Sequence, residues 1–188
     1  MDSDNELEDL CSRVIFQLHK ICDDLKLLTE KYMQVHGFDF LLLTDISEDS
    51  ASTNAVTWLG MTTAERLKHN ITAYLALEKK LERVVGEQAQ LLSPRETDLH
   101  GNLHSMLQQV SALRGQLEQM GTILGSSEES TTDTDEVEGA DGRVFEVKLR
   151  GYKVLTELNV WVVRSVKDVR KIRRERTVKK EEMVKEGE

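Results

Sequence analysis

Four stretches of the chain repeat apolar residues in steps of three and four, which is the spacing of one face of an α-helix. The first stripe consists of Leu10, Val14, Leu18, Ile21, Leu25, Leu28, Tyr32 and Val35. Gly37 follows this stripe, and glycine is the residue that most often ends a helix. The pattern therefore predicts a first helix over about residues 5–36.

The second and third stripes lie on either side of a very short connection. Thr62 and Glu65 have the spacing of a capping box, and they precede a second stripe. That stripe is Leu67, Ile71, Tyr74, Leu77, Leu81, Val84 and Gln88, which predicts a helix over about residues 63–92. Ser93, Pro94 and Glu96 predict both the end of this helix and the start of the next one. The third stripe is Leu99, Leu103, Met106, Val110, Leu113, Leu117, Met120 and Leu124, which predicts a helix over 95–124.

The fourth stripe follows a long acidic segment. Its apolar positions are Phe145, Leu149, Tyr152, Leu155, Leu158, Val162, Val166, Val169 and Ile172. They predict a helix over about residues 144–172. Beyond Ile172 the apolar spacing fails and the chain is highly charged, so we expect fraying over residues 173–188.

The lengths of the connections predict the topology. The short second connection makes helices two and three antiparallel neighbours, whereas residues 38–61 and the acidic loop 125–142 are long. At about 3.3 Å per residue, 18 residues reach roughly 60 Å, and a helix of 28 residues is only about 42 Å long. We predict an all-α, long-chain four-helix bundle of up-up-down-down topology with two long crossover loops, forming one domain over residues 1–188. The bundle is expected to be monomeric, with a core that includes Ile21, Leu25, Val110, Leu113, Leu155 and Val162.

Composition and the chain's two cysteines narrow the class of protein. The 188 residues include 39% hydrophobic and 31% charged residues, and no apolar run approaches the roughly 18 residues of a membrane span. The first ten residues are acidic and polar, unlike a secretory signal. Cys11 and Cys22 lie on one predicted helix about 16 Å apart, too far to form a disulfide. We therefore expect synthesis in a reducing compartment without conventional export.

The net charge of −9 is unevenly distributed. Residues 126–141 hold seven carboxylates and no cation, whereas residues 164–180 hold nine cations against Asp168 and Glu175. A basic segment suits nucleic acid, but this one lacks the interleaved aromatic residues of a single-strand platform. One hypothesis is therefore an intracellular helical adaptor whose basic C-terminal segment binds partners or nucleic acid.

Motifs for catalysis and metal binding are weak. His100 and His104 have an i, i+4 spacing, but Gly101 stands where a zinc protease helix has its glutamate. None of the five histidines follows a glutamate by three residues, as a di-iron bundle requires. We expect no catalytic residues, no metal and no cofactor. The sequon that begins at Asn70 is expected to be unmodified, because a protein that bypasses the secretory pathway does not meet the transferase.

Three longer motifs carry a family resemblance. They are DLCSRVIF with LLTEKY in the first helix, TTAERLKHNITAY at the start of the second, and FEVKLRGYKVLTELNVWVVRSVKDVR in the fourth. Together they resemble the ciliary neurotrophic factor family of helical cytokines. The resemblance implies a non-enzymatic ligand that is stored in the cytoplasm and acts outside the cell after a release that bypasses the secretory pathway. It implies no binding of nucleic acid and no insertion into a membrane.

The same resemblance implies three receptor partners and JAK-STAT-type signalling that promotes neuronal survival or differentiation. The partners are ciliary neurotrophic factor receptor alpha, the leukaemia inhibitory factor receptor and the signal transducer shared by the interleukin-six family. Phe145 and Lys148 match the family's contact with the leukaemia inhibitory factor receptor. The family's α-receptor face is matched by Trp58, Arg164, Asp168 and Arg170. His19 and Cys22 stand where members of the family carry arginines on that face.

The residues alone leave two plainer interpretations open. Phe145 and Lys148 share one face of a helical turn, as a receptor anchor requires, but Phe145 also fits the first position of the core stripe. Arg164 and Asp168 have the spacing of an ordinary i, i+4 surface pair.

Overall fold

The computed structural model describes residues 2–38, 55–92, 95–125 and 144–186. Four long helices dominate these ranges: α1 (Asp2–His36), α4 (Thr63–Glu87), α5 (Thr97–Ile123) and α6 (Val144–Glu186). A short helix, α3 (Ala55–Gly60), precedes α4, and a π-helical turn, η1 (Gln88–Leu92), follows it. None of the described helices has an apolar stretch that would carry it across a membrane.

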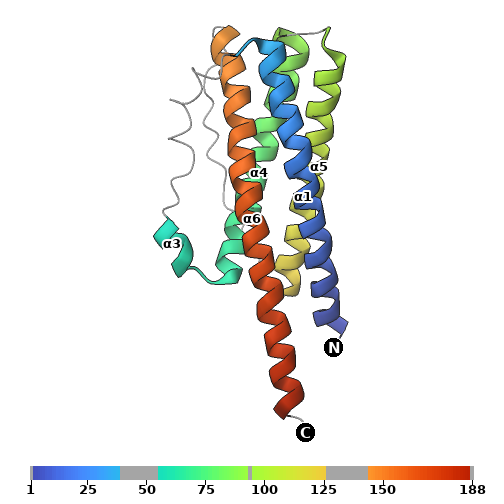
Figure 1. Ribbon diagram of the computed structural model, residues 1–188, viewed down its shortest axis with the longest axis vertical. Helices are drawn as coiled ribbons and strands as arrows, with labels where there is room; N and C mark the ends of the chain where they lie inside the picture. The colour runs from blue at the N-terminus through green and yellow to red at the C-terminus, as the bar shows by residue number, and fades with distance from the viewer. Residues whose placement is uncertain (1, 39–54, 93–94, 126–143, 187–188) are drawn as a thin grey trace.

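The long helices form a bundle of the predicted fold class. In Figure 1, α1 and α4 run in one direction, and α5 and α6 run in the opposite direction. Both α1 and α4 pack against α5 and α6, so each helix of one direction lies between two helices of the other. The up-up-down-down arrangement follows from this order.

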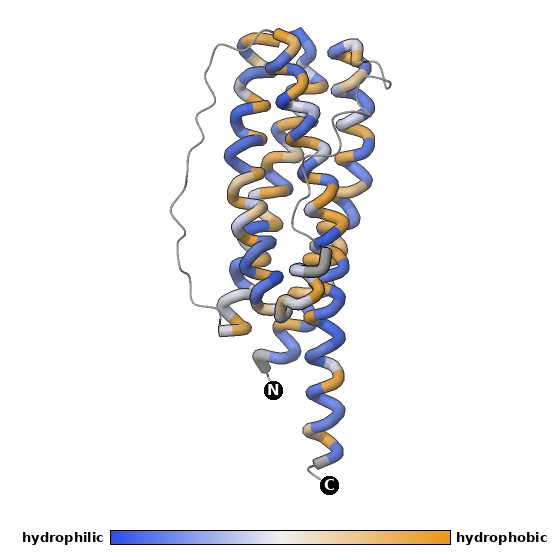
Figure 2. The backbone as a smooth tube through the Cα atoms, turned by 90° about the vertical axis from the view of Figure 1, so that its left-hand side faces the viewer, coloured by the Kyte–Doolittle hydropathy of each residue, from blue (hydrophilic) through white to orange (hydrophobic). Residues whose placement is uncertain are grey.

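Apolar stripes from all four helices meet in one core. The six core residues predicted from the sequence are all buried, so this prediction is confirmed. Tyr32 and Tyr74 are the bulkiest of the fully buried side chains. Figure 2 shows apolar residues recurring along the helices of the bundle, whereas the end of α6 that projects from it is mostly hydrophilic. The helix faces therefore follow the hydrophobic pattern.

The start of α4 agrees with its sequence signal. Thr62 and Glu65 form a capping box, in which the Glu65 N–H donates to Thr62 Oγ1 and the Thr62 N–H donates to Glu65 Oε2. The second capping pattern cannot be followed in the same way, because Ser93 and Pro94 lie outside the described residues. The N-cap of α5 is Glu96, whose side chain makes no capping hydrogen bond.

Two stretches of the predicted stripes differ from the observed core. In α4, Asn70 is buried where the stripe predicted Ile71, which is only partly buried. Near the start of α6, the buried residues are Val147, Gly151 and Val154. Phe145 is exposed, and Leu149 and Tyr152 are half-buried, so the predicted stripe was displaced from the buried face over these turns. A polar residue can replace an apolar one in the core only if its hydrogen bonds are satisfied, and those of Asn70 are described below.

The fourth helix extends beyond its predicted end at Ile172. α6 is helical to Glu186 and projects past the end of the bundle (Figure 1). Arg176 forms an ion pair with Asp4 at 3.2 Å, and Lys180 donates to Asn5 Oδ1 at 3.1 Å. The start of α1 thus supports two further turns, and the expectation of fraying from residue 173 was wrong. The lost apolar spacing marks the end of the core and not the end of the helix.

The crossover loops are described only in part. The first one contains α3, whereas we expected a loop over this whole region. Of the predicted acidic loop, residues 126–142 lie outside the described residues.

Candidate binding surfaces

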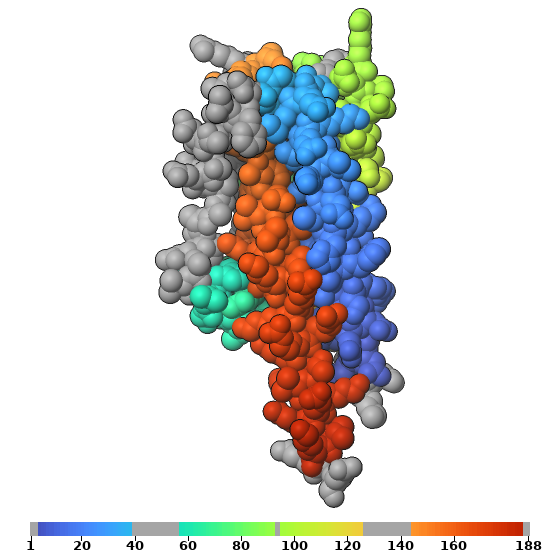
Figure 3. Space-filling view, in the orientation of Figure 1, coloured from blue at the N-terminus to red at the C-terminus, as the bar shows by residue number. Residues whose placement is uncertain are grey.

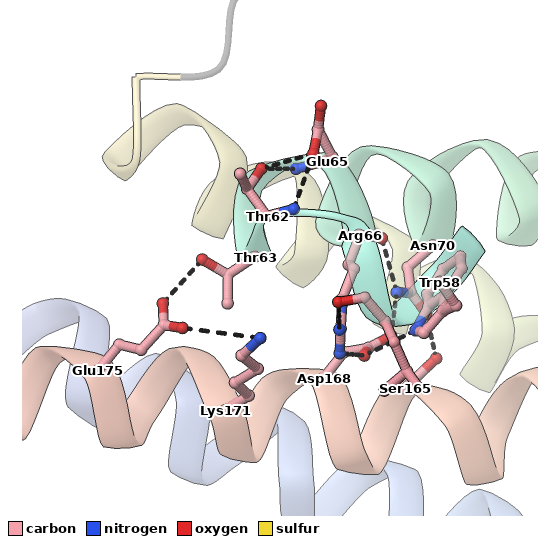
Figure 4. Close-up of polar contacts among 11 residues, drawn as sticks. Trp58, Thr62, Thr63, Glu65, Arg66, Asn70, Ser165, Asp168, Lys171 and Glu175 are labelled. Atoms are coloured by element: carbon pink, nitrogen blue, oxygen red, sulfur yellow. Dashed lines mark hydrogen bonds and ion pairs between the residues drawn. The ribbon is translucent and has the colours of Figure 1, made fainter. Parts of the chain in front are cut away.

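A buried carboxylate organises the contact of α6 with α3 and α4. Asp168 Oδ1 accepts from Trp58 Nε1 at 3.1 Å and lies 3.3 Å from Arg66 Nη1. Asp168 Oδ2 accepts from Asn70 Nδ2 at 3.0 Å. Figure 4 shows these side chains converging on Asp168 from three helices. We call Trp58, Arg66, Asn70, Ser165 and Asp168 the Asp168 cluster.

Asn70 and Ser165 satisfy one another inside the cluster. Ser165 Oγ donates to Asn70 Oδ1 and also lies 2.7 Å from the Tyr74 hydroxyl. Asn70 Nδ2 donates a second hydrogen bond to the Arg66 carbonyl at 2.8 Å. Every polar atom of the Asn70 side chain therefore has a partner, which explains why asparagine can occupy a core position.

Asp168 does not form the surface ion pair that its spacing from Arg164 allows. Its side chain is only 2% exposed, and its cationic partner is Arg66 of α4. The interpretation as an ordinary i, i+4 surface pair was therefore wrong. Because a buried carboxylate needs a cation and hydrogen-bond donors, Asp168 holds Trp58 and Arg66 in place.

Arg164 contacts two aromatic rings. Its guanidinium carbon lies 4.6 Å from the centroid of the Trp58 ring and 4.9 Å from that of the Trp161 ring. The two indoles meet edge to face, with centroids 5.9 Å apart. Cation–π contacts of this kind fix an arginine without an acidic partner. Arg164 is half-buried, so part of its side chain remains accessible from solvent.

Arg170 lies six residues, or nearly two helical turns, beyond Arg164 on the way to the C-terminus. It is exposed, and one of its guanidinium nitrogens, Nη2, is 3.2 Å from His19 Nε2 of α1. Cys22 lies one turn further along α1, where it is half-buried against the core. His19 therefore adjoins the predicted α-receptor face directly, whereas Cys22 contributes mainly to packing.

The second predicted surface lies at the opposite end of α6. Phe145 is 54% exposed, although it belongs to the first turn of the helix and has large apolar neighbours. One edge of its ring meets Phe38, with centroids 6.2 Å apart, and Phe38 in turn packs against Tyr32. The aromatic cluster of α1 supports Phe145 from beneath and leaves much of the ring in solvent.

Tyr32 fixes the backbone of α6 beside Phe145. Its hydroxyl donates to the Lys148 carbonyl at 2.9 Å. Gly151 makes this approach possible, because a Cβ at residue 151 would overlap the Tyr32 hydroxyl. Burial raises the pKa of Tyr32, so its hydroxyl stays protonated and acts as a donor. The position of Lys148 on the helix is thus set by a side chain of α1.

A buried histidine lies in the same region. His36 Nε2 is 2.8 Å from Gln88 Oε1 in η1, and its ring meets Tyr32 edge to face at 4.4 Å. Desolvation lowers the pKa of His36 and outweighs the hydrogen bond with Gln88, which raises it; the charge of Lys148 lowers it and that of Glu96 raises it by less. The imidazole is therefore kept neutral in the folded protein at neutral pH.

The predicted site residues form two separate groups. Trp58, Arg164 and Asp168 lie together, with Arg170 further along α6, whereas Lys148 and Phe145 are about 24 Å and 28 Å from Arg164 at 1.5 Å per residue. The sequence did not reveal that Arg66, Tyr32 and Gly151 position these groups. The only sequence signal of Arg66 and Asn70 is that two polar residues, four positions apart, each stand next to a residue of the apolar stripe.

The described residues contain no cluster of three or more side chains suited to a metal ion. His104 is exposed and lies 3.4 Å from Gln108 Nε2, and His100 is half-buried. Neither histidine belongs to a group of three possible metal ligands within the described part of the chain.

Comparison with known proteins gives the family. A family model described as ciliary neurotrophic factor matches residues 3–184, which is nearly the whole chain. The chain belongs to the ciliary neurotrophic factor family. This is a family of signalling ligands, so a cytokine or neurotrophic role is supported and the chain is not an enzyme.

Individual relatives agree with this assignment. Ciliary neurotrophic factor of Mus musculus is 38% identical over 163 residues, covering 86% of this chain and 82% of the mouse protein. The Homo sapiens protein is 36% identical over 167 residues, with the same coverage of each chain. Cardiotrophin-2 of Mus musculus is more distant, at 32% identity over 120 residues, 64% of this chain and 58% of that protein.

Proposed function

We propose that this chain is a cytokine that assembles a cell-surface receptor complex and triggers JAK-STAT-type signalling for neuronal survival or differentiation. The proposed partners are ciliary neurotrophic factor receptor alpha, the leukaemia inhibitory factor receptor and the signal transducer shared by the interleukin-six family. The observation that carries the proposal is the exposure of Phe145 at the first turn of α6 in a member of this family.

Phe145 and Lys148 are the proposed contact with the leukaemia inhibitory factor receptor. A half-exposed phenyl ring that is supported from beneath loses little conformational freedom on binding and can fill a pocket in its partner. Lys148 lies one turn along the same helix and offers a cation to an acidic rim. The alternative is that Phe145 belongs to the core, and the exposure of its ring argues against this alternative.

Arg164 and Arg170 are the proposed contacts with the α receptor. Trp58 and Asp168 are buried, so their proposed role is to hold Arg164 and the end of α3 in place. His19 contributes an imidazole beside Arg170 where members of the family carry an arginine, so the charge of this face is lower here.

We further propose cytoplasmic storage followed by release that bypasses the secretory pathway. The buried Asn70 supports this view. Its amide is fully engaged by Asp168, Ser165 and the Arg66 carbonyl, so a glycan could be attached there only before folding. Protein expressed in animal cells should therefore be mainly intracellular, and a glycosidase-sensitive mass shift in secreted material would contradict the proposal.

The decisive experiment adds purified protein to cells that express defined combinations of the three receptors. The expected result is phosphorylation of JAK and STAT proteins only where the leukaemia inhibitory factor receptor and the shared transducer are both present, strengthened by the α receptor. Thermally unfolded protein is the control. No response with any combination, from protein whose far-UV circular dichroism shows an intact bundle, would overturn the proposed function.

A further inference from the structure

A row of cations follows the outward face of α6 in the half nearest the C-terminus. We call it the α6 basic ridge, and it consists of Lys167, Arg170, Lys171 and Arg174. Their spacing of three, one and three residues places them on one side of the helix. Three of them are exposed, and the Lys171 side chain is 40% exposed. Figure 3 shows this part of α6, drawn in orange and red, open to solvent beside α1.

The acidic residues closest to the ridge do not neutralise it. Asp168 points into the bundle and is paired with Arg66. Glu175 accepts from Thr63 Oγ1 at 2.9 Å and lies 4.0 Å from Lys171, which makes it a weak partner. Within the described part of the chain, no carboxylate forms an ion pair with Lys167, Arg170 or Arg174. The ridge is thus a locally positive surface on a chain whose net charge is −9.

The shape of the ridge suits a linear polyanion better than a small ion. At 1.5 Å per residue, its four cations span about 10 Å along a straight helix, and Arg164 adds a further turn at one end. A single phosphate or sulfate would meet one or two of these side chains. A chain that carries an anionic group at each repeat would meet all of them and release the counterions of each.

The neighbouring side chains distinguish between kinds of polyanion. Val163 and Val178 are exposed large hydrophobic residues on either side of the ridge. Between them, α6 has no other exposed large hydrophobic residue. A helix that lies on a lipid surface needs apolar residues beside its cations. Single-stranded nucleic acid is held by aromatic stacking, and the sequence has no aromatic residue after Trp161.

We infer that the α6 basic ridge binds sulfated glycosaminoglycan chains. The choice of a sulfated polysaccharide over duplex nucleic acid rests on the proposed function, because a cytokine acts outside the cell, where sulfated polysaccharides are the abundant linear polyanions. Arginine and lysine side chains make charge-assisted hydrogen bonds to the oxygens of such anionic groups. Binding there holds the protein near cell surfaces, next to the receptors that it is proposed to assemble.

Heparin is the probe for this inference. The full-length protein should bind immobilised heparin despite its net negative charge, and chemically desulfated heparin should retain it far less. With four cationic contacts, raising the salt concentration about fourfold should weaken binding by roughly 100-fold. The triple substitution Lys167→Gln, Lys171→Gln and Arg174→Gln should reduce the affinity at least tenfold and flatten the salt dependence. Arg170 is left unchanged because it also belongs to the proposed α-receptor face.

A matched control separates the ridge from net charge. Lys68→Gln, Lys79→Gln and Arg95→Gln remove the same charge from exposed positions that are not part of α6. The inference is overturned if this control loses as much heparin affinity as the ridge variant, or if the wild-type protein does not bind heparin at low salt. It is also overturned if a nucleic acid duplex or an anionic lipid vesicle binds the ridge more tightly than heparin does. Heparin binding requires no receptor, so a failed signalling assay with retained heparin binding would count against the proposed function alone.

Discussion

Gly151 shows how a single missing side chain positions the start of α6. Tyr32 reaches across from α1 to the Lys148 carbonyl, and its hydroxyl occupies the space that a Cβ at residue 151 would need. Three further glycines in the long helices are different. Gly86, Gly101 and Gly115 have open space around the position of a Cβ. Among these four positions, the cost of glycine in a helix is balanced by a contact at residue 151.

The first prediction is that Gly151→Ala destabilises the protein. The new methyl group must displace the Tyr32 hydroxyl, which then loses its acceptor while still buried, so we expect a loss of about 1–3 kcal/mol in the free energy of unfolding. Gly115→Ala is the control and should stabilise by roughly 0.5–1 kcal/mol through helix propensity. Urea denaturation measures both. Equal behaviour of the two variants would show that the contact of Tyr32 with residue 151 is unimportant.

A second prediction at this scale concerns His36. Its pKa in the folded protein lies below the usual 6.5 because the ring is buried, so the unfolded chain takes up the proton first. The contribution of His36 to stability is therefore complete above pH 6.5 and is lost as the pH falls below this value towards the folded pKa. Glu96 and Lys148 are the charged groups whose fields act on the ring, and their effects oppose each other.

We expect the free energy of unfolding to fall as the pH drops below about 6.5, and His36→Gln should flatten this part of the profile. His104→Gln is the control, because this exposed histidine lies outside the core. The test is urea denaturation across the pH range. A slope unchanged by His36→Gln would mean that another group is responsible.

The Asp168 cluster is a buried polar contact between helices. It joins α3, α4 and α6 through one carboxylate, and each of its other members reaches Asp168 directly or through Asn70. Buried polar clusters of this kind depend on every member, because any one deletion leaves a partner unsatisfied. The orientation of α3, and with it Trp58, therefore depends on Asp168.

The prediction for this contact is that Asp168→Ala costs about 3–5 kcal/mol, because Arg66 is left buried without a partner. Trp58 also loses its acceptor, so the fluorescence of the two tryptophans should shift before the bundle unfolds. Glu157→Ala is the control: it removes an exposed ion pair with Lys80 and should cost less than about 1 kcal/mol. A comparable loss in both variants would contradict a special role for Asp168.

Hydrophobic periodicity predicted the helices and most of the core, but not the polar contacts between helices. The stripe on α5 is buried from Leu99 to Met120 as predicted, because every position is apolar and faces the core beside α1 and α4. Periodicity failed at Asn70, whose burial depends on Asp168, almost 100 residues away in the sequence. It also failed at the end of α6, where contacts with Asp4 and Asn5 replace apolar packing. Interactions between distant residues leave no local pattern.

The same limit applies to the candidate surfaces. The motif around Phe145 and Lys148 predicted which residues to examine, but only the fold shows that Phe145 lies outside the core. The sequence placed Asp168 beside Arg164, whereas the fold pairs it with Arg66. Residue type and spacing therefore indicated which side chains to group along α6 but misjudged which of them is accessible.

At the scale of the whole molecule, α6 carries every candidate surface. Phe145 and Lys148 lie at its start, Arg164 and Arg170 near its middle, and the α6 basic ridge continues from there towards the C-terminus. A rigid helix of 43 residues, about 65 Å long, keeps these surfaces at fixed distances. Partners bound at its two ends would not compete for the same residues, which is what simultaneous assembly of several receptors requires.

The last prediction tests this separation. Replacing both Phe145 and Lys148 with alanine should weaken binding to the leukaemia inhibitory factor receptor by roughly 30-fold to 1,000-fold, or about 2–4 kcal/mol, if they are central anchors. Binding to the α receptor through Arg164 and Arg170 should stay near normal, because about 24 Å of helix separates the two groups. The fold should survive, since Phe145 is largely exposed.

The matched control replaces Met183 and Lys185, an exposed apolar residue and an exposed lysine at the other end of α6. This variant loses similar groups at a different place, so it should bind both receptors as the unchanged protein does. Surface-based binding assays with each purified receptor ectodomain, together with circular dichroism, distinguish the outcomes. If the Phe145 and Lys148 variant loses helicity and both receptor contacts at once, then Phe145 stabilises the junction of α1 and α6 through Phe38 and is not a receptor anchor. Selective loss of one receptor with intact helicity can arise only if the start of α6 is itself a binding surface.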